Sequence, residues 1–210
     1  MSSEPILSVA QIVPCTKAEG PGRRFALWFQ GCPLRCPGCC NPEMLPFEGG
    51  RLIPAGAVVE QMRAARADGV EGITLLGGEP FAHAEGAAFL ARAAHALDLG
   101  VMVFSGFTLE EIHCLPDAHA PELLAHTDLL VDGPYVRELP ETRRRWIGSA
   151  NQQIHFLTAR YRPDDPCWQR PNTLEIRLHD GELTVNGFPA RAAAGLWKRP
   201  ARRRPASEAD

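Results

Sequence analysis

The sequence lacks any apolar run that approaches the roughly 20 residues needed to cross a bilayer. Its first residues, MSSEPILSVAQIV, also lack the basic segment and the cleavage site that mark a secretion signal. The net charge of −3 gives the chain as a whole no electrostatic case for binding nucleic acid or an anionic membrane. These absences predict a cytoplasmic protein that binds neither nucleic acid nor membrane.

Patterns typical of metal ligands are scarce outside one segment. The seven histidines are dispersed without an H-x-x-x-H pair, and Cys15, Cys114 and Cys167 are isolated from one another. Isolated cysteines are most often small buried hydrophobic residues. The other four cysteines lie between residues 32 and 40. In a reducing cytosol, an odd number of cysteines with such a cluster favours metal or redox chemistry over a disulfide framework.

Strand-like and helix-like segments alternate along most of the chain. Short apolar or β-branched runs predict strands at 24–31, 72–78, 101–106, 128–133 and 152–157. Helical patterns lie between them, from Pro54 until Gly69 stops the first, at 85–97, and in the segments TLEEIHCL and PELLAHT. This alternation indicates a parallel sheet covered by helices, either doubly wound or an open barrel. The units are too few for a closed eight-stranded barrel, so we predict an α/β fold of the partial, open TIM type.

The sequence changes character after residue 160. YRPDDPCWQRP is a Pro-rich connection, and the following residues alternate apolar and polar around Asp180 and Gly181, a strong β-hairpin signal. We therefore predict a barrel core over 1–160 and a C-terminal β-hairpin extension over 161–190. The remaining residues, 191–210, are basic and lack apolar periodicity, which predicts a disordered tail.

Cys32, Cys36 and Cys39 form a C-x3-C-x2-C pattern directly after the first predicted strand. The carboxyl end of a strand is where α/β folds place their sites. Three thiolates at this spacing can wrap one corner of a 4Fe–4S cubane, and because the cubane needs four ligands, one iron stays open. A structural zinc ion is the alternative, although the separate second C-x2-C pair typical of zinc sites is absent.

Several segments together resemble one family. C-x3-C-x2-C is the cluster motif of the radical S-adenosylmethionine (radical SAM) enzymes, and LLGGEP at 75–80 matches the second motif of that family. EGPGRRFALWFQGCPLRCPGC resembles the opening of the activating enzymes of glycyl-radical enzymes. The resemblance is closest to the subfamily that activates anaerobic ribonucleotide reductases, where Pro-Gly also precedes the third cysteine. VMVFSGFTLEE, DLLVDGPYV and GSANQQIHFL resemble later strands of that subfamily.

The resemblance implies a 4Fe–4S cluster held by Cys32, Cys36 and Cys39, with S-adenosylmethionine chelating the open iron. It assigns cofactor contacts to six further residues, namely Gly38, Cys40, Gly77, Gly78, Glu79 and Ser105. Glu79 would accept hydrogen bonds from the methionine ammonium, or it would only cap a helix. Ser105 would contact the ribose or the carboxylate, or serve as an ordinary turn hydroxyl. Asp132 would line the site or bond its own turn.

The resemblance further implies an oxidoreductase that cleaves S-adenosylmethionine reductively to a 5′-deoxyadenosyl radical. This radical would abstract hydrogen from a glycine of a glycyl-radical enzyme, with flavodoxin or ferredoxin as electron donor and no catalytic protein side chain. Two alternatives stay open: a radical SAM enzyme that modifies a peptide or a small molecule, and a non-catalytic iron–sulfur electron carrier. The GGEP motif argues against the carrier, which has no need of a methionine-binding turn.

Overall fold

The fold is built on one mixed sheet and a separate hairpin. The computed structural model describes residues 4–179 and 182–188. A seven-stranded sheet runs in the order β3-β1-β2-β4-β5-β6-β7. Its strands are β1 (Ile6–Thr16), β2 (Arg24–Phe29), β3 (Arg51–Pro54), β4 (Gly72–Gly77), β5 (Gly100–Phe104), β6 (Leu129–Asp132) and β7 (Gln153–Phe156).

The sheet is only partly parallel. β2, β4, β5 and β6 run parallel to one another, and these are four of the five strands predicted from sequence. The fifth, β7, pairs antiparallel with β6, so the expectation of a purely parallel sheet is wrong at this edge. β1 and β3 add an antiparallel edge beyond β2 that the sequence analysis missed. Closure of the sheet into a partial barrel stays a prediction.

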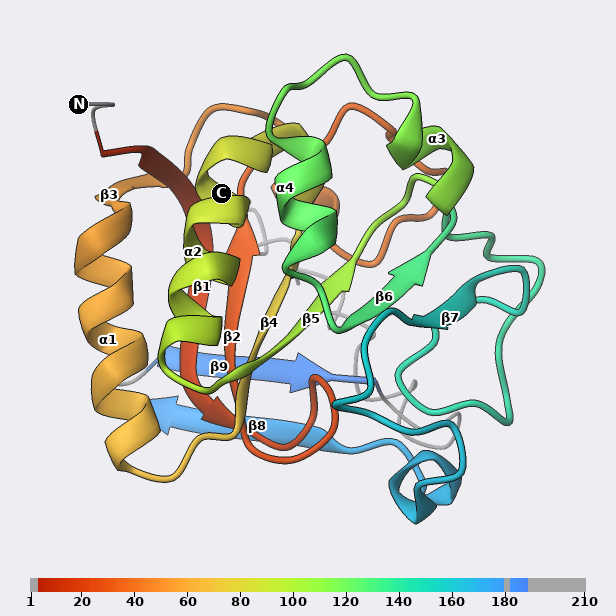
Figure 1. The fold of residues 1–210 in the computed structure, drawn as a ribbon. Helices are drawn as coiled ribbons and strands as arrows, with labels where there is room; N and C mark the ends of the chain where they lie inside the picture. The colour runs from red at the N-terminus through yellow and green to blue at the C-terminus, as the bar shows by residue number, and fades with distance from the viewer. Residues whose placement is uncertain (1–3, 180–181, 189–210) are drawn as a thin grey trace, which may run out of the picture.

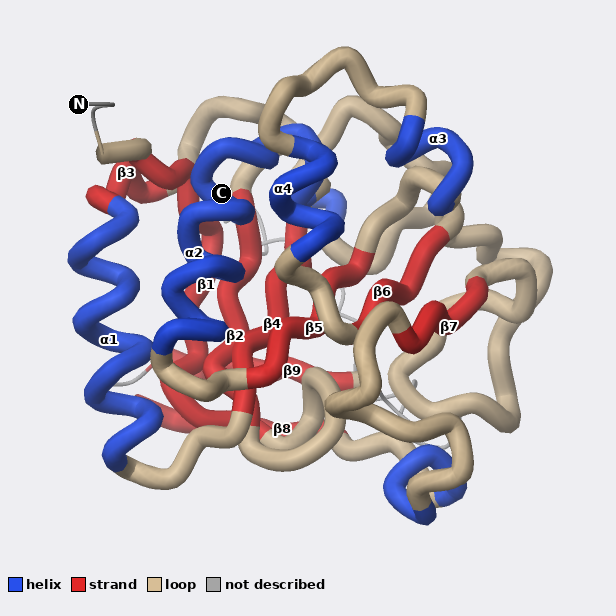
Figure 2. The backbone as a smooth tube through the Cα atoms, viewed as in Figure 1, coloured by secondary structure: helices blue, strands red, loops and turns tan. Residues whose placement is uncertain are grey.

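Four α-helices cover one face of the sheet, as Figures 1 and 2 show for α1, α2 and α4. Their bounds are α1 (Ala55–Ala67), α2 (Ala84–Ala96), α3 (Leu109–His113) and α4 (Ala120–Ala125). Short 3-10 helices are η1 (Pro42–Met44), η2 (Pro80–His83) and η3 (Pro166–Gln169). Pro54, expected as the first helical residue, instead ends β3 and precedes α1. None of the described helices is long and apolar enough to span a membrane.

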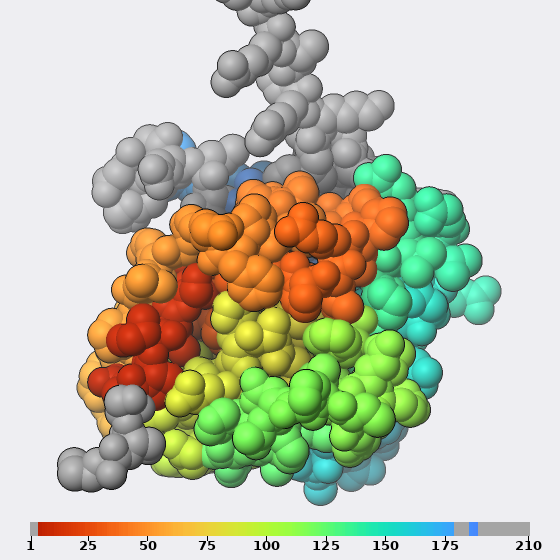
Figure 3. Space-filling model, turned by 90° about the horizontal axis from the view of Figure 1, so that it is seen from above, coloured from red at the N-terminus to blue at the C-terminus, as the bar shows by residue number. Residues whose placement is uncertain are grey.

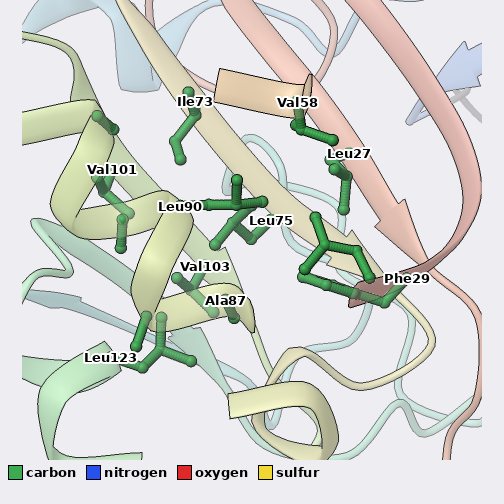
Figure 4. Close-up of a cluster of buried hydrophobic side chains, with 14 of the residues drawn as sticks. Leu27, Phe29, Val58, Ile73, Leu75, Ala87, Leu90, Val101, Val103 and Leu123 are labelled. Carbon is green, nitrogen blue, oxygen red and sulfur yellow. The ribbon is translucent and has the colours of Figure 1, made fainter. Parts of the chain in front are cut away.

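Successive side chains alternate between the two faces of the sheet. Leu27, Leu75 and Val103 point toward the helices and join the largest buried cluster, to which all four α-helices contribute (Figure 4). Trp28 and Met102 project from the same strands to the opposite face, where two smaller clusters lie. We call this opposite face the second face. Burial of each large apolar side chain on either face contributes about 1.5–3 kcal/mol to folding.

The chain beyond the sheet forms an antiparallel pair, β8 (Leu174–His179) and β9 (Glu182–Gly187). Figure 1 shows this pair running crosswise at the lower end of the sheet. Phe188, next after β9, belongs to a cluster on the second face together with Met102. The division of the chain into core, extension and tail stays a prediction, and the expected tail at 191–210 lies outside the described residues.

Candidate iron-sulfur site

The carboxyl ends of the parallel strands β2, β4, β5 and β6 meet at one edge of the sheet. The segment after β2, residues 30–41, carries the four clustered cysteines and is called the cluster loop below. Figure 3 looks onto this end of the molecule, where the segment after β2 lies beside the segments that follow β4, β5 and β6. The sequence-predicted site residues are therefore brought to a single end of the fold.

The backbone of the cluster loop turns several times, as its prolines and glycines predicted. Gly31 and Gly38 adopt φ values of +109° and +74°, which side chains rarely tolerate. The Cys32 N–H donates to Leu45 O at 3.1 Å, and the Cys39 N–H donates to Cys36 O at 3.1 Å. Cys32 is buried, Cys36 and Cys39 are half-buried, and Cys40 is exposed. These hydrogen bonds hold the loop at the end of β2.

Glycines at the ends of the neighbouring strands pack closely against the cluster loop. A Cβ on Gly78 would collide with the backbone oxygen of Gly31, and a Cβ on Gly106 would collide with the Leu34 side chain. The Gly78 N–H donates to Phe29 O at 2.8 Å, and the Glu79 N–H donates to Gly31 O at 3.0 Å. Because of these contacts, the predicted cluster motif and the GGEP motif form one connected structure.

Glu79 ties the end of β4 to the end of β5. Its side chain is 1% exposed and accepts hydrogen bonds from Ser105 Oγ at 2.9 Å and the Gly106 N–H at 2.8 Å. It also accepts from the Phe81 N–H at 3.0 Å and so caps η2. Burial raises the pKa of this carboxyl to about 7, against the opposing effect of its donors. The capping role expected as an alternative is therefore present, and a role toward the methionine ammonium stays a prediction.

Ser105 and Asp132 also make contacts at the strand ends. Ser105 Oγ, besides donating to Glu79, accepts from the Phe107 N–H at 3.1 Å, as a turn hydroxyl does. Asp132 does not bond its own turn. Its Oδ2 accepts from the Leu109 N–H at 2.7 Å at the start of α3, and it lies 3.0 Å from His155 Nε2. Asp132 thus links β6 to the segment after β5.

The thiols of the cluster loop differ in their electrostatics. A hydrogen bond with the Cys40 thiol lowers the pKa of Cys39 to about 6, and the same contact raises the pKa of Cys40. Burial raises the pKa of Cys32, although N–H groups of Leu34 and Arg35 oppose this shift. Since the thiolate is the metal-binding form, this contact favours metal binding by Cys39, with Cys40 as its hydrogen-bond donor.

The donor set fits a multi-iron cluster. Within the described residues, no three His, Cys, Asp or Glu side chains lie close enough to share one metal ion. A cubane is held differently, because each cysteine binds its own iron and the sulfurs need not converge on one point. Cys32, Cys36 and Cys39 lie on one turning loop next to the GGEP turn, and they stay the predicted ligands of such a cluster.

Three contributors to this site carried no sequence signal. Leu34 packs on Gly106, and the Arg137 guanidinium, from the segment after β6, lies against the Cα of Gly38. His83 stacks on Phe29 with ring centroids 5.1 Å apart, and burial lowers its pKa. Each contact joins segments far apart in the sequence, so neither periodicity nor a local motif could have revealed it.

The geometry agrees with the matches to known proteins. The family of 4Fe-4S single cluster domains matches residues 18–155, a range that holds every predicted cluster and cofactor residue. The chain belongs to this family. It is a radical SAM enzyme, with a 4Fe–4S cluster and S-adenosylmethionine as its cofactors.

Curated relatives are named more specifically. The chain is similar to the anaerobic ribonucleoside-triphosphate reductase-activating protein of Enterobacteria phage T4, with 30% identity over 148 residues, covering 69% of this chain and 90% of the relative. The protein of the same name from Vibrio cholerae is 30% identical over 155 residues, covering 70% of this chain and 97% of the relative. That of Escherichia coli K12 is 26% identical, with the same coverage.

Proposed function

We propose that this chain activates a glycyl-radical enzyme of the anaerobic ribonucleoside-triphosphate reductase type. The names of the relatives point to this substrate, since the chain covers almost their whole length. The observation that carries the proposal is the direct backbone contact between Gly31 and Gly78. It places a loop with three cluster cysteines against the glycine turn of the second motif.

The residues of the site divide into two groups by role. Cys32, Cys36 and Cys39 would hold the cluster, leaving one iron free of protein ligands. The cofactor S-adenosylmethionine would lie against the backbone of Gly38, Cys40, Gly77 and Gly78. It would also contact two side chains, the Glu79 carboxylate and Ser105. When bound, the reduced cluster and S-adenosylmethionine supply a 5′-deoxyadenosyl radical that abstracts hydrogen from a glycine of the partner.

The chain's own side chains position and shield this chemistry. The Glu79 carboxylate accepts three hydrogen bonds from the chain itself. A carboxylate has about four lone-pair positions, so one would stay available to a cationic ligand. Ser105 holds that carboxylate in one orientation through its hydrogen bond to Oε1. No protein base is required, because a hydrogen atom and not a proton leaves the substrate glycine.

The proposed partners are a large protein substrate and a small electron donor. A reductant of low potential, of the flavodoxin or ferredoxin kind, would supply the electron, since this chemistry uses the low end of the range of Fe–S potentials. We propose the cytoplasm as the place of action, as the sequence analysis predicted.

Anaerobic reconstitution tests the proposed function. The chain is loaded with iron and sulfide and mixed with S-adenosylmethionine, dithionite and an anaerobic ribonucleoside-triphosphate reductase. We expect 5′-deoxyadenosine and the electron paramagnetic resonance (EPR) doublet of a glycyl radical on the reductase, both absent from the Cys36→Ala variant. If 5′-deoxyadenosine forms but no glycyl radical does, the activating role is wrong and the peptide-modifying alternative gains support.

A further inference from the structure

The cluster loop is closed at its base by main-chain hydrogen bonds. The Gly31 N–H donates to Met44 O at 3.0 Å, and the Cys32 N–H donates to Leu45 O at 3.1 Å. Both acceptors lie in the segment that follows the loop. All three predicted cluster ligands belong to the stretch of chain that these two bonds close, so the bonds limit how far the loop can open.

Gln30 closes the same base with its side chain. Its Nε2 amide group donates to Glu43 O at 3.0 Å and to Pro46 O at 2.7 Å. An amide NH2 group carries two N–H donors, and both are used here. Four consecutive carbonyl oxygens, those of residues 43–46, therefore accept hydrogen bonds from residues 30–32.

The position of the Gln30 side chain is set by its surroundings. The residue is 6% exposed, and its backbone N–H donates to Ser8 O in β1 at 2.9 Å. A Cβ on Gly50 would lie only 2.6 Å from Gln30 Cβ, so the glycine packs directly on the stem of this side chain. Because backbone and stem are both held, the amide is directed at its two acceptors, which would lose this donor if the amide were removed.

The same base also joins the cluster loop to the GGEP turn. Gln30 is followed by Gly31, whose carbonyl oxygen accepts from the Glu79 N–H at 3.0 Å and lies 3.4 Å from His83 Nε2. Groups that hold metal ligands in place without touching the metal matter for binding, and their loss typically costs about 10- to 100-fold in metal affinity. Gln30 is placed to act in this way, since it is two residues from Cys32 and holds both sides of the loop.

We propose that Gln30 is a positioning residue for the 4Fe–4S cluster, whose amide keeps the base of the cluster loop closed and so holds the cysteine thiols in place and the bound cluster shielded from competing ligands. Gln30 does not bind iron itself, because both N–H donors of its amide are engaged by carbonyl oxygens. This inference rests on the proposed function in placing the cluster at Cys32, Cys36 and Cys39.

A purely structural role for Gln30 makes a different prediction. Loss of a buried hydrogen bond anywhere in the fold lowers the free energy of unfolding without acting selectively on the cluster. Thr127 provides the control for such a loss. It is fully buried, and its Oγ1 donates to Leu123 O at 2.7 Å just before β6 begins, at the opposite end of the parallel strands from the cluster loop.

The rate of iron release into a chelator tests the positioning role. The full chain is loaded anaerobically with iron and sulfide and then mixed with an excess of the ferrous chelator ferrozine. Gln30→Met removes the amide from a side chain of similar length, and Gln30→Glu keeps the shape but removes both donors. We expect both variants to release iron about tenfold faster than the unmodified chain, because release requires local opening of the loop. Thr127→Val should release iron at the unmodified rate, although urea unfolding should show that it is less stable.

Each result decides between these roles. Iron release at the unmodified rate in the Gln30 variants would overturn the positioning role and leave the proposed function intact. Equal acceleration in Thr127→Val would also overturn it, because faster release would then follow from lower overall stability. Failure of both Gln30 variants to fold would assign Gln30 to the fold alone; if only one folds, its release rate decides. An unmodified chain that binds no 4Fe–4S cluster would overturn the proposed function, and the positioning role with it.

Discussion

At each end of the parallel strands a buried ionisable side chain ties β4 to β5, and the two side chains, Glu79 and Arg24, are of opposite sign. At the carboxyl ends, the Glu79 carboxylate accepts hydrogen bonds from N–H and O–H groups of the residues after β4 and β5. At the amino ends, the fully buried Arg24 guanidinium donates to Ile73 O and Gly100 O, at the starts of β4 and β5. It also donates to Thr74 Oγ1 at 3.0 Å and to the Tyr161 hydroxyl at 2.6 Å.

The comparison separates a structural end from a chemical end. Among the residues that the structure describes, no carboxylate pairs with the Arg24 guanidinium. Carbonyl and hydroxyl oxygens accept its hydrogen bonds, so it ties strands together. Glu79 ties strands in the same way but lies next to the cluster loop. Substitutions at the amino ends should therefore lower the free energy of unfolding and leave cleavage of S-adenosylmethionine intact. Substitutions of the predicted ligands in the cluster loop should abolish that cleavage.

The largest effect is expected in the cluster loop. Cys32→Ala removes a cluster ligand, so iron and sulfide per chain should fall to background and 5′-deoxyadenosine formation should stop. Cys40→Ala should keep its iron, because Cys40 only donates to Cys39. Iron and sulfide analysis with EPR of the reduced protein measures both. Loss of the cluster in Cys40→Ala, or its retention in Cys32→Ala, would contradict the assignment of ligands.

The next largest effect belongs to the amino ends. Arg24→Leu leaves the buried oxygens of Thr74 and Tyr161 without their donor, which should lower the free energy of unfolding by about 4 kcal/mol. Tyr161→Phe, which removes one partner of Arg24, should lower it by about 1 kcal/mol. Anaerobic urea unfolding gives both values. Folded Arg24→Leu should still cleave S-adenosylmethionine at the normal rate, and a selective loss of this activity would break the comparison.

The stability of the fold should depend on pH through Glu19, a buried acid at the amino ends of the parallel strands. Burial raises the pKa of Glu19 to about 7 from its ordinary value of 4.5. The folded chain therefore binds this proton more tightly than the unfolded chain does, and stability falls as the pH rises from 4.5 to 7. The loss amounts to about 3 kcal/mol.

The Glu19→Gln variant isolates this contribution. This variant lacks the ionisable group at position 19. The difference in unfolding free energy between it and the unmodified chain should therefore change by about 2.5 kcal/mol between pH 5 and pH 8. Glu79, whose pKa is also raised to about 7, titrates in both proteins and cancels in the difference. A difference that does not vary with pH would show that Glu19 is already ionised at pH 5.

The smallest effect is expected at the link between the strand ends. Ser105→Ala removes one donor to Glu79 and one acceptor for the Phe107 N–H, which should lower the unfolding free energy by about 1 kcal/mol. Anaerobic urea unfolding measures this change. A loss as large as that in Arg24→Leu would mean that the carboxyl ends depend on Ser105 as heavily as the amino ends depend on Arg24.

Local features of the sequence were sufficient for the parallel strands and for the cluster loop. Apolar runs that end in glycine mark β2 and β4, and Cys32, Cys36 and Cys39 follow β2 within ten residues. Contacts between residues far apart in the sequence could not be predicted from such local patterns. The hairpin pattern, for example, gave the alternation of apolar and polar residues but not which face would be buried. That choice is made by Thr16 and Glu19, about 170 residues away from Asn186.

The contact between Gly31 and Gly78 has a consequence for precision. No side chain stands between the end of β2 and the turn after β4, so covalent backbone geometry and two main-chain hydrogen bonds set their separation. Side chains change rotamers within nanoseconds, whereas backbone at paired strand ends moves far less. The separation between the cysteine loop and the GGEP turn is thereby insulated from thermal motion of side chains.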